Sequence, residues 1–192
     1  MSKDISLYNI YIDLSGSMEG KGKNVILTNL RELIEHLKQK QTNDMNIQIK
    51  LGIYGFNTNV YELLPESDIQ NADAPSAASF SIKKGNGKYP VSSLKACYHH
   101  MVDLYEKMLL SGRTFVKSYV FIFTDGMIPD KIEANQVYSG KLSIPLLENA
   151  HKYIFLSGIS EYTWENKEED FSCFSQNIHD VTDLSKGLLY DI

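Results

Sequence analysis

Hydrophobic and polar positions along the chain repeat with two periods, that of buried strands and that of amphipathic helices. Residues 7–12 (LYNIYI) are mostly apolar on both alternating faces, which is typical of a parallel strand covered on both sides. After a polar turn, apolar residues recur three and four positions apart with charged residues between them: Val25, Leu27, Leu30, Leu33, Ile34 and Leu37. This second pattern predicts an amphipathic helix that packs on the sheet.

The next segment has the pattern of an antiparallel pair of strands. Residues 47–53 alternate between apolar and polar positions, and a short polar turn separates them from a second apolar run at residues 60–64. We interpret the two runs as a hairpin at the edge of the sheet. Residues 65–88 are rich in Ser, Ala, Asn, Asp and Gly, and they predict a long loop with room for one helical turn.

The second half of the chain repeats the alternation of helix and strand. Residues 91–109 carry a second helical stripe, and residues 119–123 (YVFIF) and 152–156 (KYIFL) have the composition of buried strands. A weaker helical pattern, interrupted by a proline, covers residues 131–150. Residues 169–181 are interpreted as a last helix.

Strands that alternate with helices predict an α/β fold. The expected architecture is a doubly wound, mostly parallel sheet with one antiparallel edge strand and helices on both faces. A length of 192 residues with neither repeats nor a linker predicts one domain, residues 1–192.

Composition narrows the possible functions. The net charge of −5, from 19 basic and 24 acidic residues, argues against a nucleic-acid-binding surface, which needs a basic excess on one face. The two cysteines, Cys97 and Cys173, have neither the spacing of a zinc site nor that of a disulfide framework. Because the sequence has neither a signal-peptide pattern nor a long apolar run, we expect a cytoplasmic protein without a membrane partner.

Two strands of the expected sheet end in an aspartate. Asp13 follows the first strand and Asp125 follows the YVFIF strand. If these strands are neighbours, the two carboxylates lie about 5 Å apart at the carboxyl edge of the sheet, where ligands bind in such folds. Two carboxylates this close favour a cation between them. Ser15 and Ser17, on either side of a glycine, can point two hydroxyls at the same place.

This set of oxygens predicts the kind of ion and what it does. Oxygen ligands with few carboxylates suit Mg²⁺ or Mn²⁺ better than Zn²⁺, which prefers nitrogen and sulfur. The expected metal ligands are Asp13, Ser15, Ser17 and Asp125. Few anionic ligands leave much of the ion's charge uncompensated, so that a carboxylate from another molecule can complete the site.

The motif DLSGS after a strand, followed much later by FTDGMIPD, resembles the von Willebrand factor A (VWA) domain with its metal-ion-dependent adhesion site. The resemblance covers essentially the whole chain and is closest to small bacterial intracellular members, such as those of tellurium-resistance systems. It implies a Rossmann-like VWA fold, metal ligation by Asp13, Ser15, Ser17 and Asp125, and a bound Mg²⁺ or Mn²⁺. It also implies a non-enzymatic module that binds an Asp or Glu side chain of a partner protein.

The chain departs from the family at one ligand and leaves alternatives open. In the family, a threonine before a helix is a further metal ligand, and the matching stretch here is GNGKYPVSSL. Counting back from Leu94 places Lys88 at the threonine position. If the loop is shifted, Ser92 or Ser93 can supply this ligand instead. A metal-free scaffold, in which Lys88 neutralises the two aspartates, is one alternative. A Mg²⁺-dependent phosphohydrolase is the other, although Ser15 stands where such enzymes of the haloacid-dehalogenase type carry a second aspartate.

Overall fold

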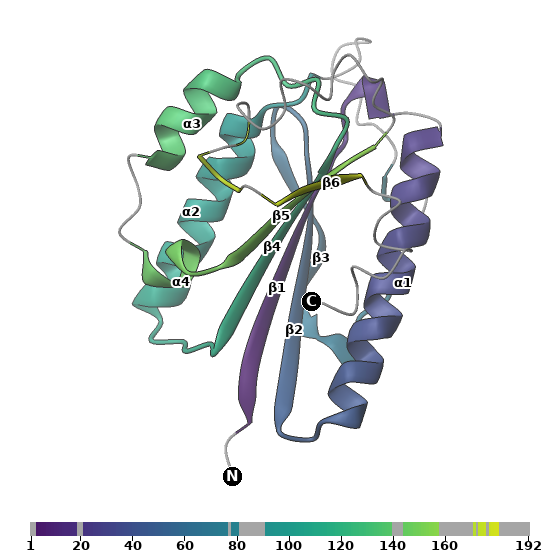
Figure 1. Ribbon diagram of the computed structural model, residues 1–192, viewed down its shortest axis with the longest axis vertical. Coiled ribbons are helices and arrows are strands. Elements are labelled where there is room, and N and C mark those ends of the chain that lie inside the picture. The colour runs from purple at the N-terminus through teal and green to yellow at the C-terminus, as the bar shows by residue number, and fades with distance from the viewer. Residues whose placement is uncertain are drawn as a thin grey trace.

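A six-stranded sheet with helices on both faces forms the core of the computed structural model, which describes residues 3–18, 21–76, 78–80, 91–139, 144–157, 171, 173–175 and 177–180 (Figure 1). The strands are β1 (Asp4–Asp13), β2 (Ile47–Phe56), β3 (Val60–Asp68), β4 (Lys117–Thr124), β5 (His151–Leu156) and β6 (Ile178–Asp180). The helices are α1 (Lys21–Asn43), α2 (Leu94–Leu110), α3 (Lys131–Ser139) and α4 (Pro145–Glu148), with short 3₁₀ helices η1 (Gly16–Met18) and η2 (Ile69–Asn71). The expected α/β class is confirmed.

The order of the strands, β3-β2-β1-β4-β5-β6, puts β1 in the middle of the sheet. Strands β2 and β3 pair antiparallel at one edge, as the hairpin pattern predicts, and all other neighbours pair parallel. The chain passes from β1 through α1 to β2 on one side, and later through α2 to β4 on the other. The strand order therefore reverses between β1 and β4, where ligands bind in doubly wound sheets.

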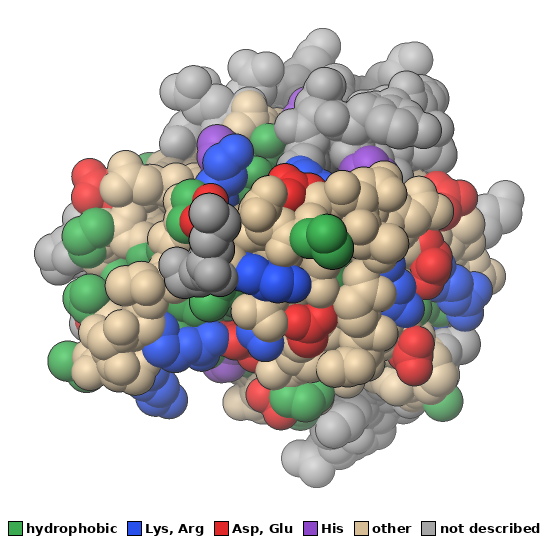
Figure 2. All heavy atoms as spheres, turned by 90° about the horizontal axis from the view of Figure 1, so that it is seen from below, with side chains coloured by type: hydrophobic (Ala, Val, Ile, Leu, Met, Phe, Trp, Pro, Cys, Tyr) green, Lys and Arg blue, Asp and Glu red, His purple; other side chains and the backbone are tan. Residues whose placement is uncertain are grey.

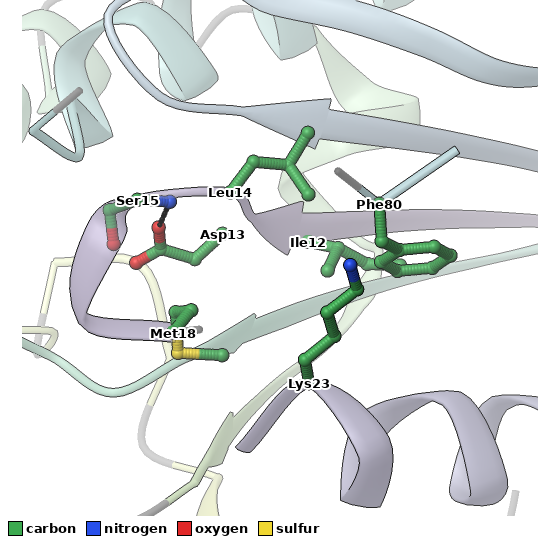
Figure 3. A pocket seen from close by; sticks show the side chains of 7 residues that line it. All are labelled: Ile12, Asp13, Leu14, Ser15, Met18, Lys23 and Phe80. Atoms are coloured by element: carbon green, nitrogen blue, oxygen red, sulfur yellow. Dashed lines mark hydrogen bonds between the residues drawn. The ribbon is translucent and has the colours of Figure 1, made fainter. Parts of the chain in front are cut away.

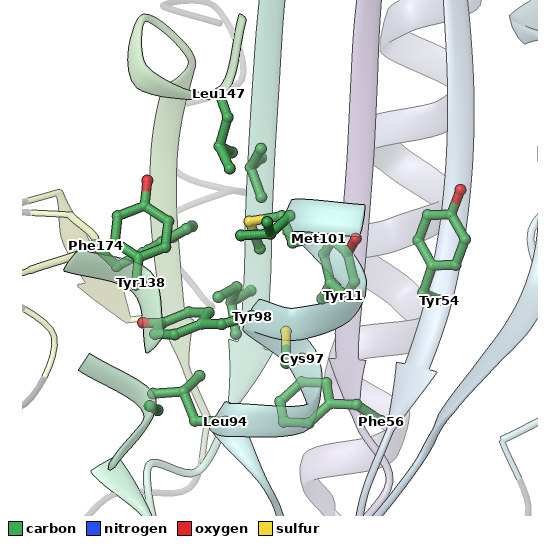
Figure 4. Packing of buried hydrophobic residues seen from close by; sticks show 14 of the residues in the cluster. Tyr11, Tyr54, Phe56, Leu94, Cys97, Tyr98, Met101, Tyr138, Leu147 and Phe174 are labelled. Carbon is green, nitrogen blue, oxygen red and sulfur yellow. The ribbon is translucent and has the colours of Figure 1, made fainter. Parts of the chain in front are cut away.

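Alternating residues of β1 face two separate cores. Tyr8, Ile10 and Ile12 pack with the apolar stripe of α1, while Leu7 and Tyr11 pack with α2 on the opposite face. Figure 4 shows the second core, where side chains of α2 lie against those of β1 and β2. Both faces of the central strands are covered, and this explains why their sequence is apolar at nearly every position.

Three segments differ from the sequence prediction. Strand β3 continues to Asp68, so residues 65–68, which were predicted as the start of a long loop, belong to the edge hairpin. The second helix begins at Leu94, with Ser93 as its N-cap, so Val91 lies before the helix and is 53% exposed. The predicted last helix is wrong at residues 178–180, which form β6 and pair parallel with the free edge of β5. The unpaired edge of a strand offers backbone hydrogen bonds that outweigh a weak local preference. None of the helices in the described parts of the chain is long and apolar enough to cross a membrane.

His100 gives the fold a pH dependence that can be measured. Its ring is half-buried against Tyr54, and its Nδ1 lies 3.1 Å from the hydroxyl of Tyr11. Burial lowers the pKa of His100, Lys107 lowers it further, and Asp103 opposes this lowering. The unfolded chain therefore binds the proton more readily, so stability falls as pH drops through about 6.5, the ordinary histidine pKa.

We expect His100→Gln to flatten this pH dependence. Between pH 7.5 and 5.5 the wild-type protein should lose more free energy of unfolding in urea titrations than the variant does, because the other titrating groups are common to both. Equal losses in the two proteins would show that His100 has the same pKa in the folded and unfolded chains.

Candidate metal site

Asp13 lies at the end of β1, on the face of the sheet that α2 covers. Its side chain is only 2% exposed and accepts hydrogen bonds from three parts of the chain. The Ser92 hydroxyl donates to both carboxylate oxygens, at 2.7 and 2.6 Å, and the Thr124 hydroxyl donates to Oδ2 at 2.7 Å. The backbone N–H of Ser15 donates to Oδ1 at 2.8 Å. Three segments distant in sequence thus meet at one carboxylate.

The two serines after β1 have different surroundings. Ser15 is 3% exposed, and its backbone bond to Asp13 closes a tight turn that leads into η1. The hydroxyl of Ser15 lies 3.1 Å from that of Ser17, which is exposed at the surface. The structure therefore brings Ser15 and Ser17 together beside Asp13, as the sequence predicts.

Asp125 follows β4 directly and lies at the same edge of the sheet. Strands β1 and β4 pair in parallel, with Ile12 opposite Phe123, so the predicted neighbourhood of the two strands is confirmed. One position further along, Asp13 comes beside Thr124, and Asp125 is the next residue of that chain. Its Oδ1 accepts from the N–H of Met127 at 2.8 Å. Ligation of a shared ion by Asp125 remains a prediction.

The turn after Asp125 depends on a glycine. Gly126 has a positive φ of 72°, a conformation that glycine adopts without steric cost. Its N–H donates to the Thr124 hydroxyl at 3.0 Å, and this hydroxyl in turn donates to Asp13. The Asp125 turn and the Asp13 carboxylate are therefore joined through one side chain.

Ser92 is the residue before α2 that reaches Asp13. Counting back to the family's threonine gives Lys88, which lies outside the described residues. Of the two serines named as substitutes, Ser92 contacts the carboxylate, while Ser93 caps α2 by accepting from the N–H of Ala96 at 3.0 Å. Among the candidates that lie in the described residues, Ser92 is therefore the one whose hydroxyl reaches Asp13.

Thr124 was missed because the sequence shows it only as the last residue of an apolar strand. Its side chain faces Asp13 because β1 and β4 run in register, and a local pattern does not reveal register between strands distant in sequence. The available signal was the polar threonine itself, which opens the TDG motif at the end of an apolar strand.

Asp130 caps a helix that is distant from it in sequence. It directly precedes α3, but its carboxylate binds the beginning of α2. It accepts from the Ser93 hydroxyl at 2.6 Å and from the N–H groups of Leu94 and Lys95 at 2.9 and 3.3 Å. An anion at the N-terminal end of a helix accepts hydrogen bonds from its free N–H groups and interacts favourably with the positive end of the helix dipole.

We expect Asp130→Ala to lower the free energy of unfolding by about 1–3 kcal/mol, because it removes an acceptor from three donors at the start of α2. Urea titration measures this loss. Asp44→Ala is the control, since exposed Asp44 accepts one side-chain hydrogen bond, from the N–H of Asn46, and should cost clearly less. Equal losses would contradict the assigned capping role.

The electrostatics of Asp13 fit a cation. Burial raises the pKa of its carboxyl, and hydrogen bonds from Ser92, Ser15 and Thr124 oppose the rise. Within the described parts of the chain no lysine or arginine forms an ion pair with it. Buried charges are normally paired or bound to metal. Among the described residues, the Ser92 hydroxyl acts only as a donor to Asp13, so its lone pairs could make it a further oxygen ligand, whereas the Thr124 hydroxyl already accepts from the N–H of Gly126.

A small cavity of about 10 Å³ adjoins Asp13, which is room for roughly one water molecule. It is lined by Ile12, Asp13, Leu14, Ser15, Met18, Lys23 and Phe80 (Figure 3). In Figure 3 the Lys23 side chain extends from α1 toward Phe80, while the Asp13 carboxylate points toward the Ser15 turn. The described residues contain no group of three or more His, Cys, Asp and Glu suited to a metal, so oxygen ligands here would be mainly hydroxyls.

Comparison with known proteins relates the chain to others by structure alone. No family model and no curated protein matches it by sequence. The pilus adhesin SpaC from Lactobacillus rhamnosus GG superposes with a TM-score of 0.64 at 11% identity, over 98% of this chain and 29% of the adhesin. BatB from Bacteroides thetaiotaomicron gives 0.60 at 11%, over 97% and 96% of the two chains.

The ArnB paralog VWA2 from Sulfolobus acidocaldarius superposes with a TM-score of 0.59 at 17% identity. The match covers 98% of this chain and 45% of VWA2. The chain therefore spans less than half the length of SpaC and of VWA2, and nearly all of BatB. At these identities the likeness concerns the fold alone, and on that evidence the chain has the fold of a von Willebrand factor A domain.

Proposed function

We propose that the protein is a non-enzymatic binding module whose carboxyl-edge site holds Mg²⁺ or Mn²⁺ and engages an Asp or Glu side chain of a partner protein. The proposed ligands are Asp13, Ser15, Ser17 and Asp125, together with Ser92. A bound ion would supply an open coordination position and an uncompensated positive charge for the partner's carboxylate.

One observation carries the proposal. Asp13 is buried, and hydroxyls from two other segments, Ser92 and Thr124, converge on it at 2.6–2.7 Å. A purely structural aspartate in a core would be a costly choice, since burying a carboxylate requires compensation that an apolar residue does not. The convergence of hard oxygens at the topological switch point supports an ion site.

The two alternatives account for the site less well. A phosphohydrolase of the haloacid-dehalogenase type needs a second acid two residues after its aspartate, and Ser15 occupies that position with its N–H bonded to Asp13. The metal-free scaffold assigns Lys88 the task of neutralising Asp13. The hydrogen bonds of the Asp13 carboxylate are already supplied by Ser92 and Thr124, so they do not require this lysine. Experiment separates these possibilities.

The proposal is tested by thermal unfolding of the protein in EDTA and in Mg²⁺, Mn²⁺ or Ca²⁺. An ion that binds only the folded protein raises the melting temperature, and the rise grows with ion concentration. We expect Mg²⁺ and Mn²⁺ to stabilise more than Ca²⁺, which prefers more carboxylates. Identical melting curves in all four conditions would reject the metal site and leave the scaffold.

Ser92→Ala should weaken Mn²⁺ binding by about 10-fold or more, because the hydroxyl both orients Asp13 and offers an oxygen to the ion. Titration followed by the electron paramagnetic resonance of free Mn²⁺ measures this affinity. Lys88→Ala is the matched comparison and should leave the affinity unchanged if Ser92 stands at the ligand position. Tighter Mn²⁺ binding by Lys88→Ala, together with an unchanged affinity of Ser92→Ala, would return the threonine position to Lys88, because a lysine there repels the ion.

A further inference from the structure

A groove lies at the end of the sheet opposite the metal site, where β4 and β5 begin. Its volume is about 360 Å³, within the range of peptide side-chain and small-ligand pockets. It is lined by Leu109, Arg113, Thr114, Phe115, Val116, Lys117, Ser118, Pro145, Leu146, Asn149 and His151. Figure 2 looks at this end of the molecule, and hydrophobic and basic side chains gather on its left, the side on which Figure 1 places the α2–β4 connection.

The walls of the groove are apolar and open to solvent. Leu109 at the end of α2 is 53% exposed, and Val116 just before β4 is 62% exposed. Leu110, the last residue of α2, does not line the groove but is 86% exposed, so three large exposed hydrophobic residues lie at the end of α2 or just before β4. Single exposed apolar residues are ordinary, but several around a concave surface indicate a binding site. Phe115 and Leu146 are partly buried and give this surface a fixed base.

The charges of the groove are all basic. Among the described residues that line it, the ionisable ones are Arg113, Lys117 and His151, and none is a carboxylate. Arg113 is already neutralised by Glu66, with one hydrogen bond of 3.0 Å, and its guanidinium lies 4.9 Å from the centre of the Phe115 ring. Lys117 is exposed and forms no ion pair with any described residue. With Arg113 paired to Glu66, Lys117 is the lining charge that favours a ligand carrying a carboxylate.

The floor of the groove is polar but already satisfied. Ser118 is 3% exposed, and its hydroxyl lies 2.7 Å from that of Tyr105, which accepts from the Asn9 side chain at 3.2 Å. This network fixes the start of β4 against α2. Because the Ser118 hydroxyl already has a partner, recognition would depend on the apolar walls and on Lys117.

We propose that this groove binds a short acidic and apolar segment of a partner protein, in which a bulky apolar side chain lies next to an Asp or Glu. The apolar side chain packs between Leu109, Phe115 and Leu146, and the neighbouring carboxylate pairs with Lys117. The site is separate from the metal site and needs no divalent ion, so the protein has a recognition surface at each end of its sheet.

The test is a titration of ¹⁵N-labelled protein in EDTA with the blocked peptide Ser-Phe-Asp-Leu-Ser. We expect saturable shift changes at Leu109, Phe115, Val116, Lys117 and Leu146. Replacing Phe and Leu of the peptide by Ser should weaken binding at least about 10-fold, and replacing its Asp by Asn should weaken it about 2- to 5-fold. Absence of saturable shifts at millimolar peptide would overturn the proposal.

Matched variants locate the binding. Leu109→Ser and Lys117→Glu should each weaken the peptide about 5- to 10-fold or more. Met45→Ser, at an 80% exposed apolar residue outside the groove, and Lys95→Glu, at the other end of α2, should leave the affinity unchanged. Three outcomes would contradict the proposed groove: equal losses of peptide affinity in the control variants, shift changes at Asp13 instead of at the groove, or self-association of the protein that blocks the groove. Because all titrations are done in EDTA, failure of the metal site does not affect the result.

Discussion

Asp13→Ala is expected to abolish the stabilisation that Mg²⁺ or Mn²⁺ gives to the wild-type protein. An ion at 100 times its dissociation constant adds about 2.7 kcal/mol to the free energy of unfolding. For a domain of this size, that corresponds to a rise of about 5–10 °C in melting temperature. Without the Asp13 carboxylate, the site loses both its buried charge and the acceptor that orients Ser92 and Thr124, so the rise should vanish.

The measurement compares melting curves in EDTA and in Mg²⁺ for each protein, so any loss of stability from the substitution itself cancels. Asp103→Ala, at an exposed position of α2, is the charge-matched control and should keep the full rise. Asp13→Asn serves if the alanine variant does not fold, because it keeps the size of the side chain. An undiminished metal effect in both Asp13 variants would place the ion elsewhere on the molecule.

Gly55→Ala should destabilise the protein by about 1–3 kcal/mol and weaken metal binding as well. A Cβ at Gly55 would lie 2.3 Å from Cδ1 and 2.9 Å from Cγ of Leu14, a side chain that is only 4% exposed. Leu14 separates Asp13 from Ser15, and its N–H donates to Phe56 on β2 at 2.7 Å. Displacing Leu14 therefore disturbs the turn that carries two of the proposed ligands.

Urea titration and Mn²⁺ binding measure the two effects of Gly55→Ala. Gly112→Ala is the control, because Gly112 has a φ of 69° but no atom within 4 Å of the place where a Cβ would lie. This control should therefore lose only about 1 kcal/mol from backbone strain and bind metal normally. Adding Leu14→Ala to Gly55→Ala should restore part of the metal affinity by relieving the contact. No recovery in the double variant would show that the clash is not the cause.

The sequence predicted the central architecture because burial leaves a strong local signal. The strands that became β1, β4 and β5 are covered on both faces, and their apolar runs differ clearly from the helical stripes between them. The edge hairpin was visible for a related reason, since β2 and β3 alternate around a short polar turn. In each case the residues that carry the signal are adjacent in sequence.

The parts that sequence did not predict depend on contacts between distant segments. Strand β6 has three residues, too few to show a period, and it forms because β5 has a free edge. The contact of Ser92 with Asp13 spans 79 positions and that of Thr124 spans 111. Asp130 caps a helix that begins 36 residues before it, although in sequence it stands directly before α3.

The three-way support of Asp13 also determines when the site can exist during folding. The turn after β1, the start of α2 and the end of β4 meet only after both crossover connections have closed around the central strand. An isolated fragment that ends before β4 would lack Thr124 and could not complete this arrangement. Ion occupancy would therefore report on the intact domain, and its binding free energy would slow the hydrogen exchange of amides that open only by global unfolding.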